Sequence, residues 1–240
     1  GKSLFMCHLA SSYLLQGLNV LYITLEMAEE RIAERIDANL LDVTMEDLHD
    51  MPQQLYEGKI TKLREKTQGQ LVIKEYPTAS AHSGHFKSLM NELALKKSFR
   101  PDVIFIDYLN ICASSRFKGG NISSYFYVKA IAEELRGLAV EFNVPIFSAT
   151  QTTRTGYVST DIGLEDTSES FGLPATADFM FALISNEELE ALGQMKVKQL
   201  KNRYNDPSIN RAFIIGVDRA KMRLFDVQPV SYTHLRAHET

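Results

Sequence analysis

Tryptophan is absent from this sequence of 240 residues, and cysteine is nearly so, with only Cys7 and Cys112. Both cysteines lie in apolar segments beside candidate nucleotide-binding motifs. Two cysteines cannot supply the disulfide framework that stabilises small secreted domains. We therefore expect the protein to work in a reducing compartment, the cytoplasm.

Long apolar runs are lacking as well, because no stretch approaches the roughly 20 residues that a membrane-spanning helix needs. We expect no membrane partner. A surplus of positive charge is also missing, since the net charge is -4 and the pI is about 5.9. That balance excludes nucleic-acid binding through a large basic surface but leaves room for a local basic site. The apolar content of 45% is enough to form the core of one sizeable domain.

Short runs rich in β-branched and aromatic residues alternate with helical patterns up to residue 151. The runs predict strands at 19–27, 70–76, 101–109 and 143–151, each apolar enough to be buried on both faces. The patterns between them predict helices at 2–16, 28–41, 84–97 and 123–142, with shorter pieces up to about 67. This alternation is typical of an α/β fold with a parallel sheet flanked by helices.

The pattern changes after about residue 176, where four strand-like runs follow one another with short turns between them. We expect an antiparallel meander that extends the sheet. Two long polar stretches, 113–124 and 152–172, directly follow predicted strand ends. Ligands bind at such ends in open α/β sheets, and loops of this length in a compact domain are usually functional.

The chain opens with Gly1-Lys2-Ser3 followed by an apolar helical pattern. In a phosphate-binding loop the lysine reaches the β and γ phosphates and the serine hydroxyl holds Mg²⁺. The N-terminus of the helix adds a favourable dipole for an anion. The tripeptide is common, so its significance depends on the residues further along the chain.

Three polar residues stand at the ends of predicted strands. Asp107 ends the apolar run "VIFID", where a carboxylate can hold Mg²⁺, although it could also cap the next turn. Glu26 follows another strand and could serve as general base for water, or cap the next helix. Gln151 could sense a γ-phosphate, or be a polar turn residue. Together with Lys2 they would converge on one sheet edge, as an ATPase of the RecA type requires.

The motifs "TLEM", "IDYL", "TQTTR" and "KNRYNDP" resemble the motif set of the DnaB family of replicative helicases. The segment "SESFGLPATADF" is similar to the variant found in T4-like phages. The resemblance covers roughly residues 1–228. It implies a RecA-like P-loop core with a C-terminal antiparallel extension. It also implies a homo-hexameric ring that hydrolyses ATP with Mg²⁺ and moves 5′ to 3′ on single-stranded DNA, with primase and helicase-loader partners.

The resemblance also implies a set of nucleotide-binding residues. Gly1 and Lys2 match the phosphate-binding group, and Ser3 and Asp107 match the Mg²⁺ ligands. Arg35 matches an arginine that the family places near the nucleotide.

Further matches concern catalysis. Glu26 matches the catalytic base and Gln151 the γ-phosphate sensor. Lys201 and Arg203 match a Lys-x-Arg pair that reaches into the neighbouring subunit's site. Strand alternation puts these two on one face, although a solvated strand edge would show the same pattern.

The DNA-facing loops of the family match 113–122 and about 164–172. In the first, Arg116, Lys118 and Gly119 suit phosphate contact. In the second, the expected contacts are Ser168, Glu169 and Ser170. The bacterial pattern has an arginine where this chain has Ser168, so an arginine contact is not expected there. Both stretches could also be ordinary surface loops.

The two ends of the chain carry further expectations. The β pattern stops at Val227, and "SYTHLRAHET" resembles a conceptual translation of sequencing-adapter DNA. We expect a motor domain over 1–228 and a non-native tail over 229–240, although an ordinary polar tail is the alternative. Most of the phosphate loop would precede Gly1, so this fragment is expected to hydrolyse ATP poorly. The remaining alternatives are a RecA/RadA-like recombination ATPase and an inactive fragment.

Overall fold

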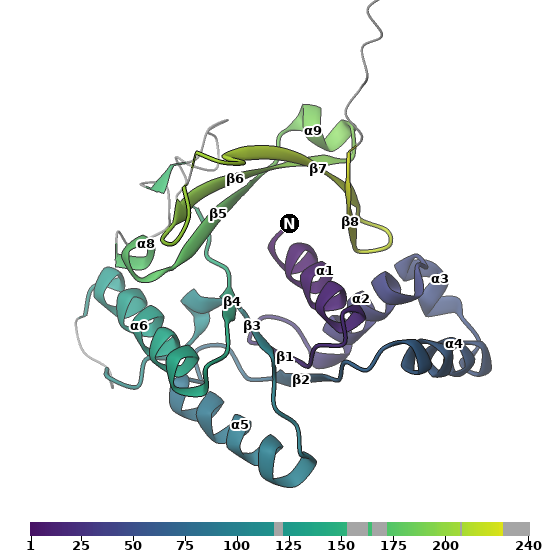
Figure 1. Cartoon of the computed structure of the whole chain (residues 1–240), viewed down its shortest axis with the longest axis horizontal. Helices are drawn as coiled ribbons and strands as arrows, with labels where there is room; N and C mark the ends of the chain where they lie inside the picture. Colours follow the sequence, from purple (N-terminus) through teal and green to yellow (C-terminus); the bar gives the residue numbers. More distant parts are fainter. Residues whose placement is uncertain (118–121, 153–162, 165–171, 207, 228–240) are drawn as a thin grey trace, which may run out of the picture.

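Two four-stranded β-sheets lie on either side of one helix, α1 (Lys2–Leu15) (Figure 1). The structure is a computed structural model that describes residues 1–117, 122–152, 163–164, 172–206 and 208–227. One face of α1 joins the core of the first sheet, and Phe5 on α1 packs against the second. The helix that follows the Gly-Lys-Ser motif is therefore held from both sides.

The first sheet is parallel with the strand order β2-β1-β3-β4. Its strands are β1 (Val20–Thr24), β2 (Leu71–Glu75), β3 (Val103–Asp107) and β4 (Ile146–Ser148). All four predicted strands and their parallel pairing are confirmed. The expected burial of both faces holds only for β1 and β3, because β2 and β4 are edge strands and stay partly exposed.

Alternate residues of the two central strands face two separate cores. Tyr22 and Phe105 point toward α1 and α2 (Glu29–Leu41), and their rings stack with centroids 5.7 Å apart. Ile23 and Ile106 point the other way, toward α5 (Ser83–Lys97) and α6 (Ser124–Phe142). Helices thus cover both faces of the sheet, which explains the continuous apolar runs in its sequence.

The helices lie within a residue or two of the predicted bounds. The shorter pieces expected up to about residue 67 are α3 (Met45–Asp50) and α4 (Gln53–Lys66), and a 3₁₀ turn, η1 (Leu109–Ile111), follows β3. The helix α6 ends at Phe142 because Asn143 adopts a left-handed conformation with φ of 51°. None of the helices in the described part of the chain is long and apolar enough to cross a bilayer.

The second sheet is an antiparallel meander with the order β5-β6-β7-β8. Its strands are β5 (Phe179–Ile184), β6 (Gln194–Asn202), β7 (Ala212–Asp218) and β8 (Arg223–Asp226), with the short helices α8 (Gly172–Thr176) before β5 and α9 (Glu187–Ala191) before β6.

The meander was predicted, but among the described residues it forms a sheet of its own and adds no strand to the first. The reason is that its inner face covers α1, as the contact of Phe5 with Phe181 shows, with ring centroids 5.1 Å apart. The expected division at residues 228 and 229 lies outside the described part of the chain and stays a prediction.

Candidate functional site

The N-terminus of α1 offers the first element of a phosphate site. Helix α1 begins at Lys2, and the amide N–H groups of a first helical turn have no carbonyl partners within the helix. Met195 of β6 lies against Gly1, because a Cβ added to Gly1 would stand 3.0 Å from the Met195 methyl carbon. The second sheet therefore contacts the first residue of the Gly-Lys-Ser motif.

Asp107 ends β3 and is completely buried. Its Oδ2 accepts a hydrogen bond of 3.0 Å from the hydroxyl of Tyr22. Its Oδ1 is buried with no hydrogen-bond partner in the part of the chain that the structure describes. A buried carboxylate oxygen left without a donor fits a water-coordinated Mg²⁺, the role predicted for Asp107. Its side chain bonds to Tyr22, so the structure does not support the alternative of a turn cap.

Glu26 is exposed two residues beyond the end of β1 at Thr24. The position that caps α2 is occupied by Ala28, which makes no side-chain capping bond. The helix-cap alternative for Glu26 is therefore wrong. Glu26 stands instead at the carboxyl edge of the sheet, just beyond β1, which pairs with the strand that ends in Asp107.

Three cations surround the start of α1. Arg219, Lys2 and Arg35 all lie close enough to Gly1 to act on it electrostatically, and Glu190 acts on it with the opposite sign. Arg35 lies on α2, where the sequence predicted a contact with the nucleotide. Arg219, in the turn between β7 and β8, was not predicted. These cations favour an anion at the start of α1, while Glu190, which lies 3.4 Å from Nη2 of Arg219, reduces the positive potential there.

Tyr108 connects the predicted residues to one another. The Nζ atom of Lys2 lies 3.8 Å from the centroid of its ring, and Nε2 of Gln151 donates a hydrogen bond of 3.2 Å to its hydroxyl. Burial, and then the charges of Glu26 and Asp107, raise the pKa of Tyr108. Lys2 and Gln151 therefore contact one side chain, which directly follows Asp107 and lies within electrostatic range of Glu26, in agreement with the strand-end pattern.

Lys201 and Arg203 lie in a different place. Nζ of Lys201 donates to the carbonyl oxygens of Pro174 and Ala175, and Nη2 of Arg203 donates to that of Ala175 over 3.0 Å. The expected shared face is confirmed, because both cations reach the C-terminal end of α8. Asp178 adds an ion pair of 3.0 Å with Nε of Arg203. No described contact joins either cation to the site around Tyr108.

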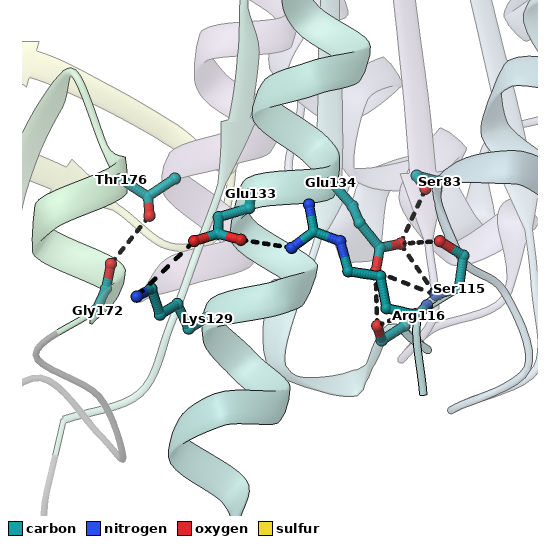
Figure 2. Close-up of polar contacts among 9 residues, drawn as sticks. Ser83, Ser115, Arg116, Lys129, Glu133, Glu134, Gly172 and Thr176 are labelled. Carbon is teal, nitrogen blue, oxygen red and sulfur yellow. Dashed lines mark hydrogen bonds and ion pairs between the residues drawn. The ribbon is translucent and has the colours of Figure 1, made fainter. Parts of the chain in front are cut away.

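The first loop that is predicted to face DNA is anchored to α6 by Glu134. This carboxylate accepts hydrogen bonds from the hydroxyls of Ser83, Ser114 and Ser115 and from the backbone N–H of Ser115 (Figure 2). Burial opposes ionisation, but these hydrogen bonds leave the pKa of Glu134 below its usual value. The beginning of the loop therefore has a fixed position, although Lys118 and Gly119 lie outside the described residues.

A chain of side chains along α6 connects the two predicted DNA-facing segments. Arg116 forms an ion pair with Glu133, and Glu133 lies 3.9 Å from Nζ of Lys129 (Figure 2). Lys129 packs against Gly172 at the start of α8, where an added Cβ would lie 2.8 Å from the lysine Cδ. Ser168, Glu169 and Ser170 lie outside the described residues, and α8 begins just after them.

Comparison with known proteins identifies the family. A family model of the DnaB-like helicase C terminal domain matches residues 1–219. The chain belongs to this family. The DnaB-like domain is 48% identical over 231 residues to the DnaB-like replicative helicase of Enterobacteria phage T4, a match that covers 95% of this chain and 49% of that protein. The chain thus spans about half the length of that relative.

Two further matches agree with the assignment. A probable plasmid replicative DNA helicase of Chlamydia trachomatis is 34% identical over 144 residues, covering 58% of this chain and 30% of that protein. A solved DnaB-like replicative helicase, described with its interactions with primase, superposes with a TM-score of 0.73 at 16% identity. That match covers 94% of this chain and 54% of the solved one. The resemblance drawn from the motifs is confirmed, and the fold is RecA-like.

Several residues of the DnaB-like domain were missed by sequence reasoning. Tyr108 stands inside the quoted motif "IDYL", and Tyr22 lies two residues before "TLEM", so the motifs could have drawn attention to both. Arg219, Glu134 and Asp178 stand in ordinary polar contexts, and only the folded chain brings them to their partners.

Proposed function

We propose that this DnaB-like domain is the ATP-driven motor of a replicative DNA helicase. The observation that carries the proposal is the meeting of Lys2, Glu26, Asp107 and Gln151 around Tyr108. The four residues come from the start of α1 and from the carboxyl ends of three adjacent parallel strands. They provide the cation, the base, the Mg²⁺ ligand and the sensor that hydrolysis of a nucleoside triphosphate requires.

Each residue has a distinct role in this proposal. Lys2 and the first-turn amides of α1 hold the β and γ phosphates. Ser3 and Asp107 would hold Mg²⁺, which neutralises charge on the phosphate oxygens when bound. Glu26 takes a proton from the attacking water as its oxygen bonds to the γ-phosphorus. The bond to the bridging oxygen then breaks, and ADP and phosphate leave. Gln151 orients the water or senses the γ-phosphate.

Lys201 and Arg203 act on a neighbouring protomer in this proposal. Both side chains are held by α8, away from the Tyr108 site of their own chain. A cation delivered from the next subunit to the γ-phosphate stabilises the charge that develops in the transition state. This requirement for a neighbour supports a closed homo-hexamer, in which hydrolysis is tied to ring contacts.

The substrate of the motor is single-stranded DNA, gripped inside the ring by 113–122 and 164–172 and moved 5′ to 3′. Only a narrow channel needs positive charge, so the acidic pI is compatible with this role. The solved relative described with primase supports a primase partner, and a helicase loader is expected beside it. The match to a phage protein supports action in the cytoplasm of a bacterial host.

The test is DNA-stimulated ATP hydrolysis by a chain extended upstream to complete the GxxxxGKS loop. We expect turnover that rises with single-stranded DNA and disappears in Lys2→Ala. Electron microscopy of the same protein with ATP should show closed rings. Open filaments on DNA would favour the recombination ATPase instead, an alternative that the family match already disfavours.

A further inference from the structure

An ion-pair chain lies at the C-terminal end of α8. Oδ1 of Asp178 lies 2.6 Å from Nη1 of Arg136 and 3.0 Å from Nε of Arg203. The hydroxyl of Tyr204 donates to the same oxygen over 3.3 Å. One carboxylate oxygen thus joins an arginine of α6, an arginine that follows β6 and a tyrosine next to it.

The carbonyl groups at the end of α8 support the same arrangement. Nη1 of Arg136 donates to the carbonyl oxygen of Thr176 over 3.1 Å, and Nη2 of Arg203 donates to that of Ala175 over 3.0 Å. The backbone N–H of Arg203 also donates to the carbonyl of Asp178 over 2.8 Å. Cations are favourable at this end of a helix because its dipole is negative there.

The contacts of Arg203 use only one side of its guanidinium group. An arginine has five N–H donors, of which the Nε and Nη2 atoms of Arg203 are engaged by Asp178, Ala175 and Ala177. Its Nη1 atom has no partner among the described residues. An arginine held along one edge, with the other edge available, is ready to donate to phosphate oxygens.

We propose that Asp178, itself held by Arg136, is the positioning residue of Arg203. It fixes the side chain in the orientation in which Nη1 reaches the γ-phosphate of the neighbouring protomer. The inference rests on the proposed role of Arg203 in trans. Its physical reason is that a long flexible cation loses much less conformational entropy in the transition state when a carboxylate has already fixed it.

The position of α8 gives the ion pairs of Asp178 with Arg136 and Arg203 a second consequence. The helix begins directly after the segment predicted to face DNA and packs on α6 through Gly172 and Lys129. Arg136 lies on α6, the helix whose Glu134 anchors the first predicted DNA-facing loop. Asp178 therefore links Arg203 to α6 and to the end of α8, the two elements that adjoin the predicted DNA-facing segments.

The test compares steady-state ATP hydrolysis by assembled rings of the extended chain. Arg203→Ala is expected to lower kcat on the order of 10³-fold or more, the effect of removing an arginine that acts in trans. Asp178→Asn keeps the shape but removes the charge, and should lower kcat roughly 10- to 100-fold, as a misplaced catalytic group does. The KM for ATP should stay unchanged, and the double variant should be no slower than Arg203→Ala alone.

Controls separate positioning from folding. Glu187→Gln removes one exposed carboxylate on α9, between β5 and β6. It should leave kcat, the melting temperature and ring formation unchanged. Arg136→Gln removes the ion pair between Arg136 and Asp178. It should lower kcat when Arg203 is present, but should have no further effect in the Arg203→Ala variant. It provides the same test if Asp178→Asn does not fold.

The outcomes are distinguishable. If Arg203→Ala is slow while Asp178→Asn keeps wild-type kcat, the positioning role is wrong and the trans role of Arg203 stands. Further slowing in the double variant would also overturn the positioning role, because Asp178 would then act independently of Arg203. Wild-type kcat in Arg203→Ala would overturn the trans role itself, and with it this inference.

Discussion

The side-chain amide of Gln151 donates a hydrogen bond of 3.2 Å to the hydroxyl of Tyr108, whose ring lies under the ammonium group of Lys2. One aromatic side chain therefore connects the predicted γ-phosphate sensor to the predicted phosphate-binding lysine. Tyr108 also directly follows Asp107, the predicted Mg²⁺ ligand, in the sequence.

Tyr108→Phe should separate the two contacts of this ring. The variant keeps the ring beneath Lys2 but removes the oxygen that accepts from Gln151. We expect kcat for ATP to fall severalfold, since a lost hydrogen bond is worth about 1 kcal/mol, with little change in KM. Tyr108→Ala should also raise KM, because the cation–π contact is lost. Identical kinetics in the two variants would show that the ring contact with Lys2 contributes nothing beyond the hydroxyl contact with Gln151.

Tyr22→Phe should remove the hydrogen bond that supports Asp107, the proposed Mg²⁺ ligand. Without the tyrosine hydroxyl, Oδ2 of the buried Asp107 loses its donor, so we expect the free energy of unfolding to drop by about 1–3 kcal/mol. Urea titration measures the change. Tyr13→Phe is the matched control, because Tyr13 packs on Phe105 and makes no described side-chain hydrogen bond. Equal effects of the two substitutions would contradict the proposed support of Asp107.

Much of this fold could be predicted from the sequence because its signals are local. Runs such as "VIFID" identify buried parallel strands, and the left-handed turn at Asn143 ends α6 where its apolar pattern stops. The convergence of Glu26, Asp107 and Gln151 also followed, since parallel strands place their carboxyl ends at one edge. The separation of the second sheet could not be predicted, because strand patterns do not show which sheet a strand joins.

The links between distant elements could not be predicted for a similar reason. Arg136 and Asp178 are 42 positions apart in the sequence, and nothing near either residue indicates the other. The placement of Lys201 and Arg203 on one face was predictable from strand alternation, but their target on α8 was not. Side-chain partners chosen by tertiary packing leave no periodic signal.

Acidic pH should weaken the contact between α1 and β8. Nδ1 of His8 accepts the backbone N–H of Leu224 over 3.2 Å, and burial, then Arg223, lower the pKa of His8. As pH falls below about 6.5, His8 binds a proton in the unfolded chain but stays neutral in the folded protein. The free energy of unfolding therefore decreases. The contribution is complete above about pH 6.5 and is lost as pH falls toward the lowered pKa of the folded state.

His8→Asn tests this dependence, because an amide oxygen can accept the Leu224 N–H but does not titrate. The free energy of unfolding should decrease more between about pH 7.5 and about pH 5.5 in wild type than in the variant. The other five histidines contribute equally to both proteins. The same pH dependence in both would show that His8 stays uncoupled from folding.

Gly172→Ala should disturb the contact between α8 and α6. The added Cβ would lie 2.8 Å from Cδ and 3.1 Å from Cβ of Lys129, too close for a normal contact. Overpacking of this kind typically costs about 1–3 kcal/mol, measurable by urea titration. Lys129→Ala removes the Cγ and Cδ atoms, so the double variant should recover most of the loss. Additive losses in the double variant would mean that the two side chains do not compete for this space.

The measurement that tests the proposed motor most directly is ATP turnover by Glu26→Gln in the extended chain, with single-stranded DNA present. Glutamine keeps the shape of Glu26 but cannot accept the proton of the attacking water. We expect turnover to be abolished while equilibrium binding of ATP stays at the wild-type level. Turnover at the wild-type rate would remove Glu26 from the mechanism and contradict the site described around Tyr108.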